Sequence, residues 1–491
     1  MTTEKRWLGL AVLGGTLMFA SAASADEPGP VTPASKPAPA AAAPAAPVAL
    51  AEAGPGPVDQ ALDADLAGGA GSTLTTDEVA RRAQGSSYDV AAKQAEVAAA
   101  QAALDAAVWA FTPKLTAAAR YTRLSDPGSA ELAPGVTIPV FLDSYSLGGS
   151  LQVPLSDYIL RMPKAKAAAS AGVRAARIGV QSTQLEVATA ARELYYNWVR
   201  ARLQVVIAAQ ALAQGQAHLA DAKAAAEVGT ASRADVLQVE AQVASAELLV
   251  ERAKNLTALT EHQLRTTMHD PDGVYRIGED VRADPATPGG VGDQPALWRE
   301  AISSRLELRQ LREAEAATRA EAGLSKVAYL PRLDAFADAN YVNPNQRSFP
   351  QKDEFSWNWD AGLQLSWTPS DIPAARANVR RAQAKLAQLE AQRAALEDGL
   401  RTQVVAALQS YRQALVAIDT TGRALTAAEE AYRVRRLLFQ NGRATSAELT
   451  DAETSLTGVR LENLGARIEL RVALARLDHV LGRDRAAARS K

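Results

Sequence analysis

One strand-and-long-helix unit occurs twice in this sequence, and the duplication limits the fold more than any other feature. The segment Phe111-Thr112-Pro113-Lys114-Leu115 has a counterpart in Tyr329-Leu330-Pro331-Arg332-Leu333. In each copy a proline ends a helical stretch and an alternating segment follows. Further local features recur at nearly the same offset, about 213 to 218 residues, so both halves should share one architecture.

The alternating segments predict β-strands at about 114–124 and 144–155 in the first copy, and at about 332–342 and 355–367 in the second. Every odd position from Phe355 to Trp367 is apolar, while the even positions are Ser, Asn, Asp, Gly or Gln. A period of two places all the apolar side chains on one face. We expect this face to contact lipid, through Tyr145, Leu147, Leu151, Trp357, Trp359, Leu363, Leu365 and Trp367, and the polar face to line water.

Heptad spacing follows each strand pair. One set is Trp198, Val205, Leu212 and Leu219, and the other is Tyr411, Ile418, Leu425 and Tyr432. Seven-residue spacing keeps an apolar stripe on one side of supercoiled helices. Helices over about 157–228 and 371–441 would each be about 105 Å long at 1.5 Å per residue. Such lengths predict rods rather than the core helices of a globular domain.

Each rod ends in a glycine and a capping sequence, which predicts hairpin tips at about 229–235 and 442–448. Glycine is a favoured residue just after a helix, and Ser or Thr followed three residues later by an acid resembles a capping box. The tip residues of the first copy are Gly229, Thr230, Ser232 and Asp235, and those of the second are Gly442, Arg443, Thr445 and Glu448.

The domain organisation follows from these elements. A signal peptide is expected at 1–25, since Lys5 and Arg6 precede an apolar stretch and Ala23-Ser24-Ala25 offers a cleavage site. A Pro/Ala-rich disordered linker is expected at 26–73. The first unit covers 74–268 and begins with a helix to about 112, a connector covers 269–294, the second unit covers 295–482, and 483–491 is a tail.

Composition argues against several functions. The net charge of −2 gives no field that would attract nucleic acid, and the absence of cysteine excludes disulfides and thiolate metal sites. His218, His262, His269 and His479 lie in no metal or catalytic-triad spacing, so surface or packing roles are expected for them. We find no phosphate loop and no nucleophile elbow, and therefore expect neither an enzyme nor a bound cofactor.

Four strands cannot close a barrel. In lipid an open edge leaves backbone groups unpaired, so several chains must combine their strands. The strand count therefore predicts an oligomer but does not give the number of chains in it.

The ordered set of motifs, from Leu74 to Gly482, resembles the TolC-like outer-membrane efflux proteins. The resemblance implies an α+β membrane protein: a homotrimer whose 12-stranded β-barrel continues into an α-helical coiled-coil barrel in the periplasm. It also implies an exit duct for efflux or type I secretion, in which the hairpin tips contact a periplasmic adaptor and an inner-membrane transporter supplies the substrate.

The resemblance further implies a periplasmic gate at the tips. Glu448 and Asp451 fall where the family places acidic entrance rings, and Asp235 falls where neighbouring hairpins are tied shut. The tyrosine and arginine of that latch are replaced by Phe439 and Ala444, so Arg443 or Arg233 is a candidate substitute that would pair with Asp235. A simpler alternative is that Glu448 only caps its helix and that Asp451 is a solvated surface acid.

Two other interpretations would each explain part of this pattern. A periplasmic adaptor would also carry a long hairpin, but a single one rather than two that each follow strands. A coiled-coil scaffold would explain the heptads but would have no use for the alternation from Phe355 to Trp367.

Overall fold

The computed structural model of this 491-residue chain describes residues 57–67, 71–125, 130–133, 136–138, 141–283, 285 and 291–484. The chain divides into two units, and the first, Met1–Gly54, lies outside the described residues together with the predicted signal peptide. Every described helix and strand belongs to the second unit, Pro55–Lys491.

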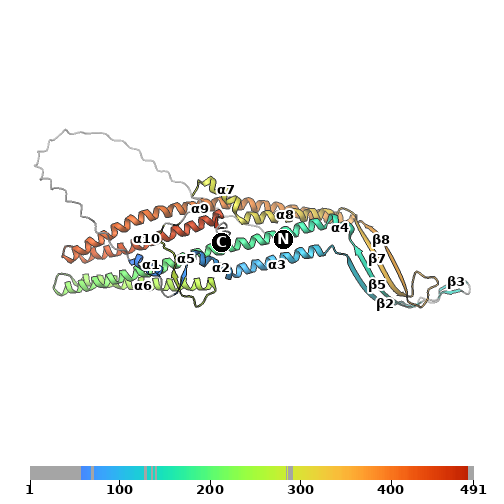
Figure 1. Cartoon of the computed structure of the whole chain (residues 1–491), viewed down its shortest axis with the longest axis horizontal. Coiled ribbons are helices and arrows are strands. Elements are labelled where there is room, and N and C mark those ends of the chain that lie inside the picture. The colour runs from blue at the N-terminus through green and yellow to red at the C-terminus, as the bar shows by residue number, and fades with distance from the viewer. Residues whose placement is uncertain are drawn as a thin grey trace, which may run out of the picture. The chain divides into compact units, whose positions relative to one another are not determined.

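Helices dominate this unit (Figure 1). In chain order they are α1 (Pro57–Ala67), α2 (Thr76–Ser86), α3 (Tyr88–Trp109), α4 (Leu155–Leu160), α5 (Met162–Glu227), α6 (Arg233–Met268), α7 (Gln294–Ser304), α8 (Leu306–Val327), the 3-10 turn η1 (Pro369–Asp371), α9 (Ile372–Gln440) and α10 (Ser446–Leu481). The 66 residues of α5 and the 69 residues of α9 make each helix about 100 Å long at 1.5 Å per residue.

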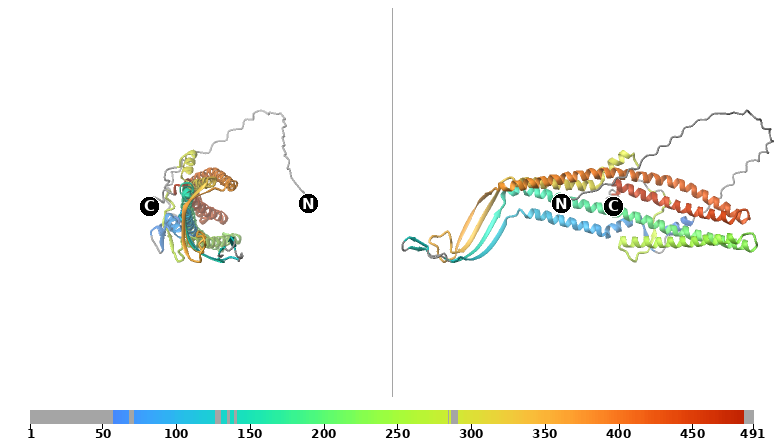
Figure 2. Two further views of the ribbon diagram at one scale, coloured as in Figure 1. Left: turned by 90° about the vertical axis from the view of Figure 1, so that its right-hand side faces the viewer. Right: turned by 180° about the vertical axis from the view of Figure 1, so that it is seen from behind.

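Four long strands form one antiparallel sheet in the order β2-β5-β7-β8. Their bounds are β2 (Lys114–Arg123), β5 (Asp143–Val153), β7 (Arg332–Asn343) and β8 (Ser356–Ser366). Two smaller pairs are β1 (Ser72–Leu74) with β6 (Tyr275–Ile277), and β3 (Ala130–Ala133) with β4 (Val136–Ile138). The sheet lies at one end of the helices and the two hairpin tips lie at the other (Figures 1 and 2).

The two longest helices organise the packing, since α5 and α9 run through both halves of the helical part (Figure 1). In the half nearer the sheet, the helices lie side by side in the order α3, α5, α8, α9. In the half nearer the tips, the order is α6, α5, α10, α9. One lateral edge of the helical layer is therefore formed by α3 and α6, and the other by α9.

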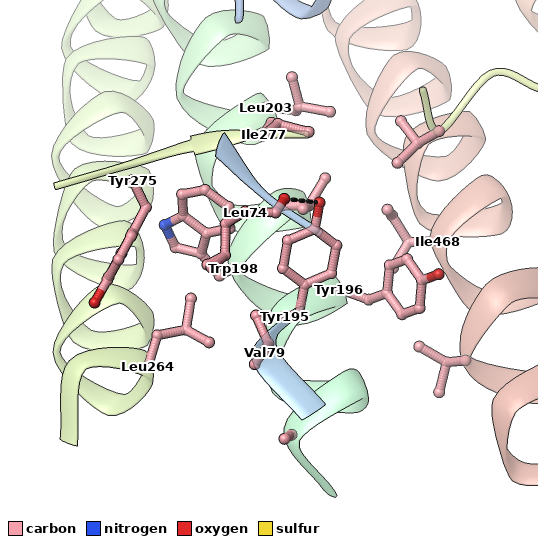
Figure 3. Packing of buried hydrophobic residues seen from close by; sticks show 14 of the residues in the cluster. Leu74, Val79, Tyr195, Tyr196, Trp198, Leu203, Leu264, Tyr275, Ile277 and Ile468 are labelled. Atoms are coloured by element: carbon pink, nitrogen blue, oxygen red, sulfur yellow. Dashed lines mark hydrogen bonds between the residues drawn. The ribbon is translucent and has the colours of Figure 1, made fainter. Parts of the chain in front are cut away.

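The largest core cluster lies midway along α5 (Figure 3). Tyr195 and Trp198 are fully buried there against Leu74 of β1 and Ile277 of β6. The Tyr195 hydroxyl donates a hydrogen bond of 2.9 Å to the Leu74 carbonyl oxygen. Full burial of a large apolar side chain stabilises a fold by about 1.5–3 kcal/mol. This cluster thus fixes the segment before α2 and the connector after α6 to the long helix.

The prediction of a disordered linker up to residue 73 was wrong at its end. Residues 57–67 form α1, which packs on α5, and residues 72–74 form β1, which pairs in parallel with β6. Val58, Leu62 and Leu66 recur at four-residue spacing, and Leu62 is fully buried. This short amphipathic stripe was hidden by the Pro/Ala-rich composition before it. The rest of the predicted linker, 26–56 and 68–70, lies outside the described residues.

The uninterrupted helix predicted over 74–112 was also wrong. Ser87 is extended, with φ −66° and ψ 125°, and its side chain accepts a hydrogen bond from the Val90 backbone N–H. It thereby ends α2 and begins α3. The second copy breaks at Arg305 with almost the same backbone angles, φ −62° and ψ 127°. The duplication therefore extends to a break that hydrophobic periodicity alone does not reveal.

Candidate functional site

The register of the sheet collects apolar side chains from all four strands on one face. Tyr145 lies opposite Tyr121, Leu151 opposite Leu115, and Trp359 opposite Ala339. The eight residues that we expected to face lipid are all exposed in the single chain, from 38% for Leu151 to 75% for Trp359: Tyr145, Leu147, Leu151, Trp357, Trp359, Leu363, Leu365 and Trp367. Such an apolar face is unusually large for a surface in contact with water.

Aromatic rings lie together on this face at the end of the sheet away from the helices. The centroid distances are 5.1 Å for Tyr121–Tyr145, 5.1 Å for Tyr341–Phe355 and 5.1 Å for Tyr341–Trp357. At the helical end, the exposed Trp367 donates its indole N–H to the Tyr329 carbonyl oxygen at 3.3 Å. Aromatic side chains at both ends of an apolar band are typical of a membrane-spanning sheet.

The opposite face of the sheet is mainly polar. Ser150, Asp338 and Asp360 occupy one row across three strands. Arg347, from the loop between β7 and β8, reaches this face and places Nη2 2.8 Å from Asp360 Oδ1. The ion pair offsets the repulsion that two adjacent carboxylates would otherwise produce. Among the described residues, no strand pairs with the outer edge of β2 or β8.

The hairpin tips have the same construction in both copies. Gly229 and Gly442 adopt positive φ values of 78° and 67°, which glycine tolerates without steric cost. Ser232 then caps α6 and Thr445 caps α10, each within a capping box. The Thr230 hydroxyl adds a bond of 2.9 Å to the Ala225 carbonyl oxygen.

Both capping boxes engage acids that we expected at the gate. Asp235 Oδ2 accepts hydrogen bonds of 2.9 Å and 2.7 Å from the Ser232 N–H and hydroxyl, and the hydroxyl lowers the Asp235 pKa. Glu448 Oε2 accepts a bond of 2.9 Å from the Thr445 N–H, which lowers the Glu448 pKa. Its Oε1 lies 2.8 Å from Arg435 Nη1. Glu448 therefore caps its helix, but it remains exposed and ionised.

The other two gate candidates are not engaged in the same way. Asp451 is exposed one turn beyond Glu448. Arg443 is also exposed, and within the described chain no ion pair joins it to Asp235. The structure thus brings together Glu448 with Arg435, a partner that the sequence did not suggest, and leaves Arg443 and Asp235 apart in one chain.

A buried polar contact near the tips was missed by sequence reasoning. His218 of α5 is 3% exposed, and its Nδ1 lies 3.2 Å from Glu453 Oε2 of α10. Its Nε2 lies 3.0 Å from the Ser446 hydroxyl oxygen, and its ring meets Phe439 edge to face at 5.1 Å. Because more than 200 residues separate the partners, local motifs gave no signal for this contact. It joins the first hairpin to the second.

Within the described part of the chain, no cluster of three or more His, Cys, Asp or Glu residues could hold a metal ion. A separate question is whether a described helix could cross a membrane, and none is both long and apolar enough to do so.

Comparison with known proteins agrees with this geometry. The family model for outer membrane efflux proteins matches residues 79–268 and 297–483. The OprN outer-membrane channel is similar, with 20% identity, a TM-score of 0.69, and coverage of 83% of this chain and 89% of that one. CusC has 17% identity and a TM-score of 0.70, with coverage of 84% of this chain and 93% of that one. VceC from Vibrio cholerae has 17% identity and a TM-score of 0.69, with coverage of 83% of this chain and 96% of that one. No curated protein matches the sequence.

The chain belongs to the outer membrane efflux protein family. Its fold is the mainly helical α+β fold of outer-membrane channels. The family resemblance inferred from the sequence is confirmed, as are the outer-membrane location and the function of an efflux channel. The family is one of transport rather than catalysis, and the adaptor or scaffold reading is not favoured.

Proposed function

We propose that three copies of this chain combine their sheets into a 12-stranded β-barrel in the outer membrane. The observation that carries this proposal is the sheet itself, with one apolar face and two edges that pair with no other described strand. An unpaired strand edge is very costly in lipid, so neighbouring chains would join β2 to β8. The number three comes from the family resemblance, since four strands from each of three chains make twelve.

The helices support the same head-to-tail closure. On α6 the exposed Leu237, Leu248 and Leu259 are spaced by eleven residues, which keeps them on one face of a helix. On the opposite lateral edge, Leu415 and Val416 of α9 are also exposed. Contacts between α9 of one chain and α3 and α6 of the next would bury both edges in a closed ring. The ring would form a coiled-coil barrel continuous with the β-barrel.

The polar face of the sheet would line the pore, and the eight exposed apolar residues would face lipid. The protein would act as an exit duct that conducts passively, and an inner-membrane transporter would supply the energy. The tip residues Gly229, Thr230, Ser232, Gly442 and Thr445 would contact a periplasmic adaptor. The capped tips are well suited to this role, since their backbone is fixed before docking.

The tips would also form the gate. Glu448 and Asp451 lie three residues apart on one face of α10, so symmetric copies would stack acidic rings that favour cations. Because no ion pair joins Asp235 to Arg443 within the described chain, a closing contact between them would have to involve a neighbouring chain. Exposed ion pairs are individually weak, and closure would need all the copies together.

Reconstitution tests this function. The full chain should fractionate with the outer membrane, run as a trimer by native mass spectrometry, and give discrete conductance steps in planar lipid bilayers. Recovery of a soluble periplasmic monomer that gives no conductance would contradict the proposal.

A further inference from the structure

An open hollow of about 440 Å³ lies where the sheet meets the helices. Its lining residues are Tyr329, Pro373, Arg376, Val379 and Arg380. Tyr329 also accepts the hydrogen bond from Trp367, which ends the apolar face of the sheet at this level. The hollow therefore borders the apolar band on its helical side.

Two arginines of this hollow have no acidic partner among the residues that the structure describes. Arg376 and Arg380 are exposed one turn apart on α9, and no ion pair or hydrogen bond joins either guanidinium to another described side chain. By contrast, Arg423 and Arg433, farther along the same helix, each pair with an acid at 3.0 Å and 2.6 Å. Within the described residues of a single chain, no acid therefore neutralises the two guanidiniums at the hollow, and both are available to bind an anion.

The charge pattern around the hollow is not that of an ordinary solvated helix. From Ile372 to Leu389 the chain carries four basic residues and no acid, and the first acid is Glu390. The start of α5 repeats this pattern, with no acid between Met162 and Leu185. Both long helices therefore begin, next to the sheet, with a basic segment.

Exposed apolar side chains also lie at the junction of the sheet and the helices, where the hollow is. Besides Trp367, they include Trp109, Leu330, Leu155 and Ile159, with exposures from 36% to 78%. These residues suit the interfacial layer of a membrane, where apolar and polar groups meet. At 1.5 Å per residue, Arg376 and Arg380 begin only about 6 to 12 Å beyond the start of α9, within reach of lipid headgroups.

We propose that this hollow binds the anionic headgroup of a phospholipid from the periplasmic leaflet of the outer membrane. Arg376 and Arg380 bind the phosphate through their forked N–H groups, and the acyl chains lie along Trp367 and Leu330. The site rests on the proposed barrel, because it requires the apolar face to stand in lipid. It would fix the depth of the barrel in the membrane.

Native mass spectrometry of the purified full-length trimer tests the site, with phosphatidylglycerol and phosphatidylcholine titrated separately. The double variant Arg376→Gln/Arg380→Gln should bind phosphatidylglycerol about 25-fold more weakly. Each arginine near the membrane surface should contribute a factor of about five to the affinity for an anionic lipid. The matched control Arg423→Gln/Arg433→Gln, on the same helix but far from the sheet, should bind it like the unchanged protein.

Three results would overturn the proposal: unchanged phosphatidylglycerol binding in the double variant, equal binding of phosphatidylcholine, or displacement of the lipid by millimolar inorganic phosphate, which would indicate a free-anion site. Loss of the trimer in the double variant would instead assign the arginines to the contact between chains. The failure of the proposed function is distinguishable, because then the unchanged protein itself would not assemble or conduct.

Discussion

His218 Nδ1 lies 3.2 Å from Glu453 Oε2, and this contact links the two hairpins inside one chain. Both residues are buried, at 3% and 6% exposure. A carboxylate in such a place must be paired or neutralised, because removal of its charge from water is costly. The imidazole supplies that partner and uses its second nitrogen to hold Ser446 at the start of α10.

Replacement of His218 by leucine should destabilise the chain by about 3–5 kcal/mol, because Glu453 would remain buried without a partner. The pair His218→Leu/Glu453→Leu should recover most of that loss. Denaturant unfolding measures both effects. His262→Leu is the matched control, since that imidazole is exposed on α6. A double variant no more stable than the single one would show that the loss does not come from the unpaired carboxylate.

Glu448→Gln should lower cation selectivity and leave the tip folded. Glutamine can replace glutamate in a capping box, so the change removes the charge with little effect on the cap. The Thr445 N–H lowers the Glu448 pKa, so the charge should persist as the pH falls and be lost only below the ordinary range of a glutamate. Reversal potentials in a salt gradient measure this. Equal selectivity in Glu448→Gln and the unchanged channel would contradict the acidic ring.

Asp478, near the end of α10, should make stability depend on pH. Burial raises its pKa to about 6, and Oδ1 is buried without a hydrogen-bond partner among the described residues. The folded state therefore binds this proton more tightly than the unfolded state, and stability falls as the pH rises from about 4 to about 6. Asp478→Asn should stabilise the protein by up to about 2 kcal/mol above pH 6 and have little effect near pH 4. Unfolding curves at both pH values test this, and a pH-independent gain would refute it.

Trp359→Lys should impair assembly in the membrane, because a lysine facing lipid near the middle of the bilayer costs about 2–4 kcal/mol. Asn358→Lys, the next residue along β8 but on the polar face, should be tolerated. The yield of trimer in the outer membrane measures both. Equal yields of the two variants would show that the apolar face does not stand in lipid.

The sequence predicted the elements that depend on periodicity. Alternation from Phe355 to Trp367 indicated a strand, and β8 runs from Ser356 to Ser366. The capping residues Ser232 and Thr445 indicated the tips, and both make capping boxes. These signals are local, because a helix cap and a strand face are set by neighbours in the chain.

Contacts between distant segments leave no local pattern in the sequence. The His218–Glu453 pair and the Arg435–Glu448 pair depend on how helices pack, and no spacing in the chain encodes them. The break at Ser87 was missed although its signal is local, since Gly85, Ser86 and Ser87 are residue types that commonly end one helix and cap the next. α1 was missed because its apolar stripe is only three residues long.

Cross-linking between β2 and β8 of neighbouring chains tests the central claim most directly. The natural chain has no cysteine, so any disulfide that forms must join the introduced cysteines. Ala118→Cys would be combined in turn with cysteine at Ser356, Asn358, Gly362 and Gln364, all on the same face of the sheet. A disulfide needs Cα atoms within about 7 Å, so only one or two adjacent β8 positions should yield a covalent trimer. If oxidation of intact membranes produced no covalent species larger than a monomer at any position, the three-chain barrel would be contradicted.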